Sequence, residues 1–147
     1  GVTNCTRVIP VPKKGNEYVA ISGSKLVRIT LYDNAGVPAL ANVVSYSPNA
    51  GTINAIDIDY SNPLNIALAA SKGVAVSVDG GETFSLDSVF STSIHGTAKA
   101  VLILADTEAG QPVVSIESVL QRLLVGTSKG LFTRASSPAG VWGWGEY

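Results

Sequence analysis

Short apolar runs separated by small polar turns recur along the whole chain. Three segments share one pattern: an apolar strand, a turn that contains Ser-Lys, and a second strand of alternating character. Lys25, Lys72 and Lys129 mark the three turns and are separated by 47 and 57 residues. This spacing is close to the roughly 40–50 residues of one four-stranded propeller blade. The pattern therefore predicts an all-β chain built from repeated antiparallel sheets. The three segments are residues 18–29, 66–77 and 122–133.

The predicted fold is a β-propeller with about three four-stranded antiparallel blades, approximately residues 1–46, 47–96 and 97–147. Propellers close with typically 4–8 blades, so three blades would leave two apolar blade faces in water. We therefore expect the chain to form part of a larger ring. The other blades would come from the same larger protein or from identical chains. The sequence contains no Met and begins at Gly1, from which we expect a processed product or a segment of a longer protein.

The connecting stretches fit the same architecture. Residues 43–46 and 113–116 are short β-branched runs and are expected to be strands. Residues 118–124 have the propensity for a helical turn, but we interpret them as a loop that enters a strand. Elsewhere no helical period persists long enough to predict a substantial helix.

Composition narrows the classes of partner. The 147 residues suit one ordinary domain, and a net charge of −1 with 14% charged residues offers no electrostatic footprint for nucleic acid. The longest apolar runs, such as residues 101–105, are far shorter than the roughly 20 residues needed to cross a bilayer. We predict no nucleic-acid partner, no membrane insertion and no cofactor.

Residues 77–84, Ser-Val-Asp-Gly-Gly-Glu-Thr-Phe, predict a tight turn between two strands. The Asp79 carboxylate can accept hydrogen bonds from backbone N–H groups of the turn, and the Ser77 hydroxyl can do so more weakly. Gly80 and Gly81 permit positive φ without a Cβ clash. Phe84 is expected to cover the hairpin with apolar surface. These five residues are the predicted structural turn, and no catalytic residue is assigned among them.

This octapeptide resembles the Asp-box, or BNR repeat, whose pattern is Ser/Thr-x-Asp-x-Gly-x-x-Trp/Phe. The resemblance covers residues 53–86, where a strand ending in an acid, an Asn-Pro turn, a strand ending in Ala-Ser and a Gly-Val pair precede the box. Similar blades occur in propellers of the xyloglucanase, sialidase, sortilin and photosystem II assembly factor types. The resemblance implies that the box serves folding at the blade periphery. The corresponding stretches 30–36 and 134–142 depart from the pattern.

Asp57 and Asp59 are a candidate carboxylate pair. Side chains at i and i+2 of a strand leave on one face, about 7 Å apart. Glycoside hydrolysis uses two carboxyl groups about 5–9.5 Å apart, and some Asp-box propellers are glycosidases. This position recurs in the blades of the family, however, so a structural role is favoured over catalysis.

The remaining candidates are weaker. His95 is the single histidine and has no partners at metal-ligand spacing, so no metal site is predicted. A catalytic set of Ser93, His95 and Asp106 has no support from spacing, and we interpret His95 as a surface or turn residue. Cys5, the single cysteine, excludes an internal disulfide and is expected to be a half-buried apolar residue near a terminus.

The C-terminal segment carries Trp142, Trp144 and Tyr147 between glycines. These aromatic residues could form a sugar-stacking platform or an interface anchor, or they could pack one blade against its neighbour. Packing or an interface is favoured, with Trp142 in the position that Phe84 holds one blade earlier.

Three functions remain open. The favoured one is a non-catalytic propeller module that acts as a binding or assembly scaffold, outside the cell or on a virion surface. The second is a fragment of an Asp-box glycoside hydrolase in which Asp57 or Asp59 is catalytic. The third is a lectin-like propeller that closes by association of identical chains and binds carbohydrate.

Overall fold

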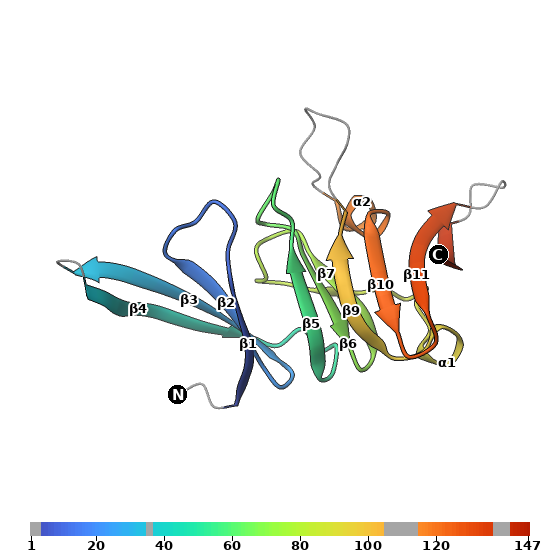
Figure 1. Ribbon diagram of the computed structural model, residues 1–147, viewed down its shortest axis with the longest axis horizontal. Helices are drawn as coiled ribbons and strands as arrows, with labels where there is room; N and C mark the ends of the chain where they lie inside the picture. Colours follow the sequence, from blue (N-terminus) through green and yellow to red (C-terminus); the bar gives the residue numbers. More distant parts are fainter. Residues whose placement is uncertain (1–3, 35–36, 105–114, 137–141) are drawn as a thin grey trace.

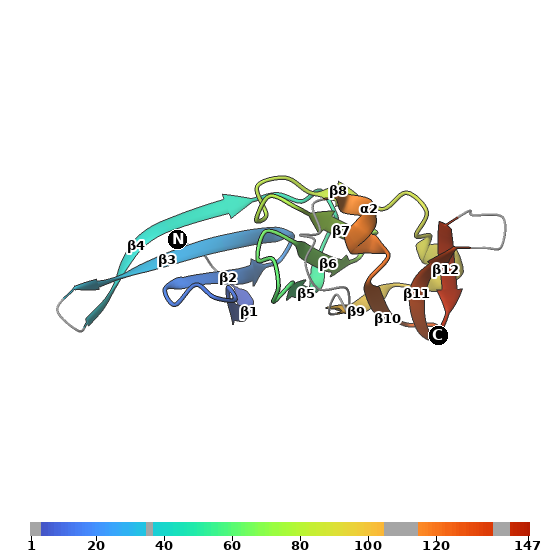
Figure 2. The ribbon, with the colours of Figure 1, turned by 90° about the horizontal axis from the view of Figure 1, so that it is seen from above.

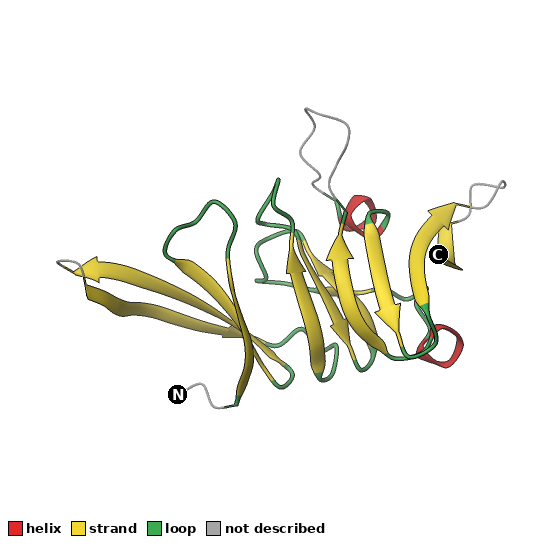
Figure 3. Ribbon diagram, in the orientation of Figure 1, coloured by secondary structure: helices red, strands yellow, loops and turns green. Residues whose placement is uncertain are grey.

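The computed structural model describes residues 4–34, 37–104, 115–136 and 142–147. The described chain is all-β and forms three four-stranded antiparallel sheets, with two short helices between strands (Figures 1 and 3). In every sheet the strands lie side by side in sequence order, so each sheet is a simple meander. The prediction of an all-β chain with three four-stranded antiparallel sheets is therefore confirmed.

The sheets follow one another along the chain, and each falls within one of the ranges 1–46, 47–96 and 97–147. The first sheet contains β1 (Cys5–Pro10), β2 (Glu17–Ser22), β3 (Lys25–Asn34) and β4 (Val37–Tyr46). The second contains β5 (Ile53–Ile58), β6 (Ile66–Ala70), β7 (Gly73–Ser77) and β8 (Ser85–Leu86). The third contains β9 (Ala98–Ile103), β10 (Leu123–Thr127), β11 (Leu131–Ser136) and β12 (Trp142–Glu146). The helices are α1 (Thr92–His95) and α2 (Ile116–Leu120).

The second sheet lies between the other two, and the order of the sheets along the long axis follows the sequence (Figures 1 and 2). All five residues of β6 are buried. Because successive strand side chains point to opposite faces, Ile66 and Leu68 pack toward the first sheet, while Ala67 and Ala69 pack toward the third. The continuous apolar run of β6 is thus explained by burial on both faces.

Two hydrophobic cores result, one on each side of the second sheet. The core shared with the first sheet contains Val11, Val19, Ile21, Leu26, Ala50, Ile53, Ile56, Ile58, Ile66, Leu68, Ala70 and Ala75. The core shared with the third sheet contains Ala55, Ala67, Ala69, Val74, Val76, Phe90, Ala98, Ile103, Val119, Leu120, Leu123 and Val125. The two sets alternate along β6 and β7, as period-2 strands require.

The second and third sheets use the same contact between the start of the sheet and its central turn. In the second sheet the backbone N–H of Thr52 donates to Ser71 Oγ, at 3.0 Å, and the N–H of Ser71 donates to the Thr52 carbonyl, at 2.9 Å. In the third sheet Thr97 and Ser128 make the same two contacts, each at 3.1 Å. The Ser-Lys pairs of these turns were apparent from the sequence pattern. The Gly-Thr pairs that precede the first strand of each of these two sheets were not recognised as part of the repeat.

The first sheet departs slightly from the repeat. Ser22 pairs with Lys25 across its central turn, so Lys25 is a strand residue, whereas Lys72 and Lys129 lie within their turns. Residues 30–34, interpreted as part of a degenerate Asp-box, instead belong to the long strand β3. With β4 this strand forms a hairpin that extends away from the rest of the molecule (Figure 2).

Two further expectations were wrong. Residues 116–120 form helix α2, capped by Ser115, which accepts a hydrogen bond from the backbone N–H of Ser118. The apolar Val119 and Leu120 of α2 enter the core between the second and third sheets, and this tertiary packing favours the helix over the predicted loop and strand. Cys5 is exposed on β1, not half-buried, because β1 is the edge strand of its sheet.

Candidate functional site

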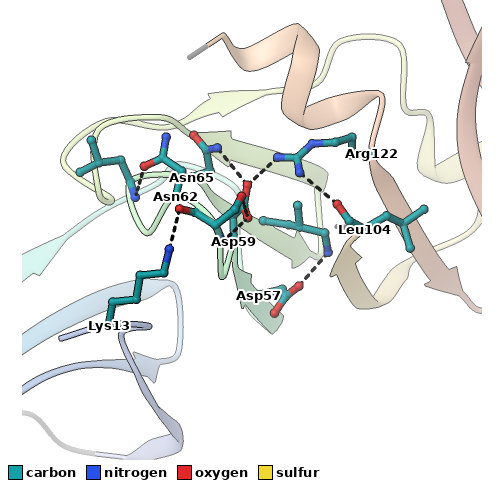
Figure 4. A network of polar contacts seen from close by, with 10 residues as sticks. Lys13, Asp57, Asp59, Asn62, Asn65, Leu104 and Arg122 are labelled. Carbon is teal, nitrogen blue, oxygen red and sulfur yellow. Dashed lines mark hydrogen bonds and ion pairs between the residues drawn. The ribbon is translucent and has the colours of Figure 1, made fainter. Parts of the chain in front are cut away.

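The Asp57–Asp59 pair lies where the second sheet meets the third (Figure 4). Asp59 follows the end of β5, and only 4% of its surface is exposed. Its Oδ1 accepts from the backbone N–H of Ser61, at 2.9 Å, and from the Ser61 hydroxyl. Its Oδ2 accepts from Asn65 Nδ2, at 3.2 Å, and forms an ion pair with Arg122. Both oxygens of this carboxylate are therefore committed within the protein.

The charged form of Asp59 is strongly favoured. Burial by itself would raise the pKa of this carboxyl, but hydrogen bonds from Ser61, Arg122 and Asn65 outweigh burial and lower the pKa to about 2. A general acid needs a carboxyl that holds its proton near the working pH. The Asp59 carboxylate is therefore suited to pairing with the Arg122 guanidinium and not to donating a proton at neutral pH.

Asp57 bonds to the edge of the neighbouring sheet. Its Oδ2 accepts from the backbone N–H of Ile103, at 2.7 Å, on the edge of the third sheet that β10 does not cover. Asn54, also on β5, donates from Nδ2 to the Ala98 carbonyl on the same strand, at 2.7 Å. Arg122 adds a hydrogen bond to the Leu104 carbonyl, at 3.0 Å. Polar side chains of β5 thus form hydrogen bonds with backbone groups of β9 on the edge where no neighbouring strand pairs with it.

The Ser77–Phe84 turn has the hydrogen bonds expected of a rigid loop. Ser77 Oγ accepts from the backbone N–H of Gly81, at 2.9 Å, and Asp79 Oδ1 accepts from the N–H of Thr83, at 3.0 Å. Gly80 and Gly81 have φ angles of 78° and 94°, the positive values for which the glycines were singled out. Burial would raise the pKa of Asp79, but hydrogen bonds from Thr83 and Ser77 lower it below its usual value. The carboxylate of Asp79 is thus directed into its own turn.

The turn also contacts the first sheet. Arg28 on β3 donates from Nη1 to the Gly80 carbonyl, at 3.3 Å, and pairs with Glu17. The hydrogen bond from Arg28 and its charge lower the pKa of Glu17 despite partial burial. Phe84 packs against the core between the first and second sheets. The turn therefore forms part of the boundary between these sheets, and sequence reasoning did not single out Arg28.

A second buried ionic cluster, centred on Asp87, was missed by sequence reasoning. Asp87 follows β8 and accepts from Arg134 Nη1, at 3.1 Å, and from Trp144 Nε1. Arg134 also pairs with Glu117 of α2, at 3.3 Å. The cluster joins the end of the second sheet to β11 and β12. Nothing in the local sequence around Asp87 distinguishes it from an ordinary loop aspartate.

The C-terminal aromatic residues do not share one environment. The Trp144 ring packs edge-on against Phe90, with ring centroids 5.2 Å apart, and joins the core between the second and third sheets. Tyr147 is 80% exposed. The side chain of Trp142 lies outside the described residues. The indole of Trp144 is packed and hydrogen-bonded, so it is not a free sugar platform.

His95, which we expected to be a surface or turn residue, is buried at the end of the four-residue helix α1. Its Nδ1 accepts from the backbone N–H of Ser91, at 3.0 Å, and its ring contacts those of Phe90 and Phe132. The Ser93 hydroxyl bonds to the Ser91 hydroxyl, at 2.8 Å. Asp106, the third member of the catalytic set considered above, lies outside the described residues. The contacts of His95 are those of a packed turn residue.

Within the described residues no group of three or more His, Cys, Asp or Glu side chains is placed to hold a metal ion. No helix in the described part of the chain has the length and apolar character needed to span a membrane. Comparison with protein-family models, curated proteins and solved structures gave no match.

Proposed function

We propose that this chain is a β-propeller module of the Asp-box type that acts as a rigid binding or assembly scaffold. One observation carries the proposal: the three sheets follow one another with the same faces turned toward the preceding and the following sheet. Ile66 and Leu68 of β6 face the preceding sheet, as Leu123 and Val125 of β10 do. Such a repeated stack of four-stranded meanders is what a series of propeller blades requires.

The use of the polar residues supports a scaffold over an enzyme. Asp57 bonds to the edge of β9, and Asp59 bonds to Arg122, Asn65 and Ser61. The Asp87 cluster bonds to β11 and β12. Ion pairs and hydrogen bonds in such positions fix one sheet relative to the next, because an unpaired buried charge is costly. A fixed arrangement of sheets is the property that a scaffold needs.

The proposal includes a place and a class of partner. A chain with few charges and many Ser, Thr, Asn and Gly residues suits a module outside the cell or on a virion surface. Its partners would be further propeller blades, with carbohydrate as a possible ligand of the assembled surface. The loops between strands would carry any such ligand, since loops on a rigid scaffold commonly carry binding residues.

The rival glycosidase function can be tested directly. Wild-type protein and the Asp57→Asn variant would be incubated with β-glucan, xyloglucan and sialyl-lactose, and released reducing sugar and sialic acid measured. The scaffold proposal expects no release above a heat-inactivated control. Hydrolysis by the wild type that is lost in Asp57→Asn would overturn it.

The rigidity of the module has its own test. Hydrogen exchange followed by mass spectrometry would compare peptides from the three sheets. Amides of β6 and β7 should exchange most slowly, because both faces of these strands are buried. Fast exchange of β6 and β7, at the rate of the exposed β1, would contradict a rigid stack.

A further inference from the structure

The last sheet has an apolar face turned away from the rest of the molecule. Leu102 and Leu124 are directly paired across β9 and β10, and Gly126 pairs with Leu131 of β11. Directly paired residues share a face, and this face is opposite to the one that Leu123 and Val125 turn toward the second sheet. We call it the outer face of the third sheet. Its large members are Leu102, Leu104, Leu124 and Leu131, of which Leu102 is 49% exposed.

The first sheet has a corresponding outer face. Val19 and Ile21 turn toward the second sheet, so Ala20 lies on the opposite side of β2. Ala20 pairs with Val8 on one side and with Val27 on the other. One row further along, Tyr18 pairs with Ile29, which in turn pairs with Val43. Ala20 and Val27 are buried within this surface, while Val8 is 55% exposed at its margin.

Inside the chain, the face that one sheet turns to the following sheet packs on the face that the following sheet turns back. The outer face of the third sheet is of the first kind, and the outer face of the first sheet is of the second kind. Leu124 and Gly126 precede Ser128 at the spacing at which Ala67 and Ala69 precede Ser71, and Ala67 and Ala69 face the following sheet. Across the central turns, Ala20 corresponds to Leu68, which faces the preceding sheet. Among the described residues, no sheet covers the outer face of the third sheet and no sheet covers the outer face of the first.

The sizes of the side chains are complementary. Between the second and third sheets, the small Ala67 and Ala69 share a core with the large Leu123 and Val125. The outer face of the third sheet has a large residue, Leu124, beside Gly126, while the outer face of the first has Tyr18 beside the small Ala20. Large residues of one face would again meet small residues of the other, as close packing requires.

The positions that make polar contacts between the second and third sheets are apolar on the outer face of the third sheet. Leu102 and Leu104 follow Gly96 at the spacing at which Asp57 and Asp59 follow Gly51. The second sheet uses these aspartates to bond to the third, whereas the third sheet carries exposed leucines in their place. The large residues named on the two outer faces are uncharged, and the charged Lys25 pairs with Ser22 at the turn end of the first sheet, where its ammonium group can stay in water. Association would therefore bury mainly apolar surface.

We propose that the outer face of the third sheet binds the outer face of the first sheet in a second copy of this chain. This proposal rests on the proposed propeller function and names its partner. Two copies joined in this way at both ends place six sheets in one closed ring, within the 4–8 blades typical of propellers. The contact is head-to-tail, and a ring of two copies leaves neither outer face in water.

The first test compares the masses of matched variants by size-exclusion chromatography with light scattering. Wild-type protein should have the mass of two chains, and Leu102→Asp and Val8→Asp should each shift it toward one chain. A buried carboxylate should raise the dissociation constant of the dimer at least about a hundredfold. Leu64→Asp is the control, because Leu64 is 50% exposed in the loop between β5 and β6 and lies on neither face. It should remain a dimer.

The second test distinguishes a head-to-tail contact from a symmetric one. Mixing Leu102→Asp with Val8→Asp leaves one contact intact, between the third sheet of the Val8→Asp chain and the first sheet of the Leu102→Asp chain. The mixture should therefore recover dimers that neither variant forms alone. Association that is lost in Leu102→Asp and retained in Val8→Asp would overturn the head-to-tail arrangement.

Failure of the dimer proposal can be distinguished from failure of the scaffold proposal. Circular dichroism and thermal unfolding would establish that each variant keeps its fold, since the substituted side chains are largely exposed. A wild-type protein that stays a folded monomer at high concentration would overturn the ring and leave the scaffold proposal intact. Hydrolytic activity in the glycosidase assay would overturn the scaffold proposal without bearing on the mass.

Discussion

Arg122 donates from Nη2 to Oδ2 of Asp59 across 63 residues of sequence, and so joins the entry of β10 to the end of β5. The same guanidinium donates from Nη1 to the Leu104 carbonyl at the end of β9. One arginine thus connects three strand ends from two sheets. Asn65 and Ser61 satisfy the rest of the Asp59 carboxylate, whereas the buried Arg122 Nε has no hydrogen-bond partner within the part of the chain that the structure describes.

The first prediction concerns acid stability. The folded-state pKa of Asp59, about 2, lies below the ordinary value of 3.8 for an aspartate, so the charged carboxylate stabilises the fold above pH 4. A difference of this size corresponds to roughly 2 kcal/mol, which should be lost as the pH falls from about 4 to about 2. Urea unfolding of the wild type and Asp59→Asn at several pH values would measure it. The variant should be less stable at pH 7, with a weaker dependence on pH below 4.

Glu82→Gln provides the control for the loss of one negative charge, because Glu82 is exposed. It should follow the wild-type profile in the acid range. An Asp59→Asn variant as acid-sensitive as the wild type would mean that other carboxyls dominate; the lowered pKa values of Asp79 and Glu17 make these the first residues to examine.

The second prediction separates an ion pair from a simple contact. Arg122→Met removes the cation and leaves the Asp59 carboxylate buried with its neutral partners alone. Breaking one side of a buried pair costs about 3–5 kcal/mol, so the free energy of unfolding should fall by about 3 kcal/mol. The double variant Arg122→Met/Asp59→Asn should lose less than the sum of the two single variants. Additive losses in urea unfolding would show that the two side chains do not act as a pair.

The strand pattern was predictable because it depends on local periodicity. Alternation around the turns at Lys72 and Lys129 indicated paired strands, and β6 pairs with β7 and β10 with β11 across these turns. The apolar run at 101–105 was expected to suit a strand buried on both faces, but Leu102 and Leu104 are exposed. The positive φ angles of Gly80 and Gly81 followed from the chemistry of a tight turn. These features require no knowledge of which segments meet in space.

The contacts between sheets were not predictable in this way. Asp87 and Trp144 are 57 residues apart, and neither local sequence indicates the other as partner. Arg122 lies in a segment interpreted as a loop, so its pairing with Asp59 could not be foreseen. Helix α2 was missed because burial of Val119 and Leu120, not their propensity, favours it. Sequence reasoning identified Asp57 and Asp59 as one carboxylate pair and favoured a structural role, but it did not indicate their contacts with the third sheet.

The third prediction concerns the Asp87 cluster. Asp87→Ala removes the acceptor for Arg134 and for the indole of Trp144, and it leaves the buried guanidinium with Glu117 alone. The free energy of unfolding should fall by about 3 kcal/mol. In a Trp142→Phe background, the emission of Trp144 should move to longer wavelength as its ring loosens from Phe90. Ser85→Ala is the control, because Ser85 is an exposed residue of β8 two positions before Asp87. It should alter neither the stability nor the emission.

An unchanged emission maximum in Asp87→Ala would show that packing on Phe90 suffices to hold the indole. A loss of stability without a change in emission would assign the energy to Arg134 and not to Trp144. Either result would alter the view of β12 as a strand held to the second sheet through Asp87.

The fourth prediction tests the glycine turn where two sheets meet. Gly81 has a φ of 94°, and a Cβ added there would lie 2.9 Å from Leu26 Cδ2, in the core between the first and second sheets. Gly81→Ala should therefore lower the free energy of unfolding by about 1–3 kcal/mol, from backbone strain together with displacement of Leu26. Gly15→Ala is the matched control, because a Cβ there would meet no atom within 4 Å. It should leave stability within about 0.5 kcal/mol of the wild type. Equal stability of the two variants in urea would mean that the turn adapts without cost, so that Gly81 does not fix how the first sheet packs on the second.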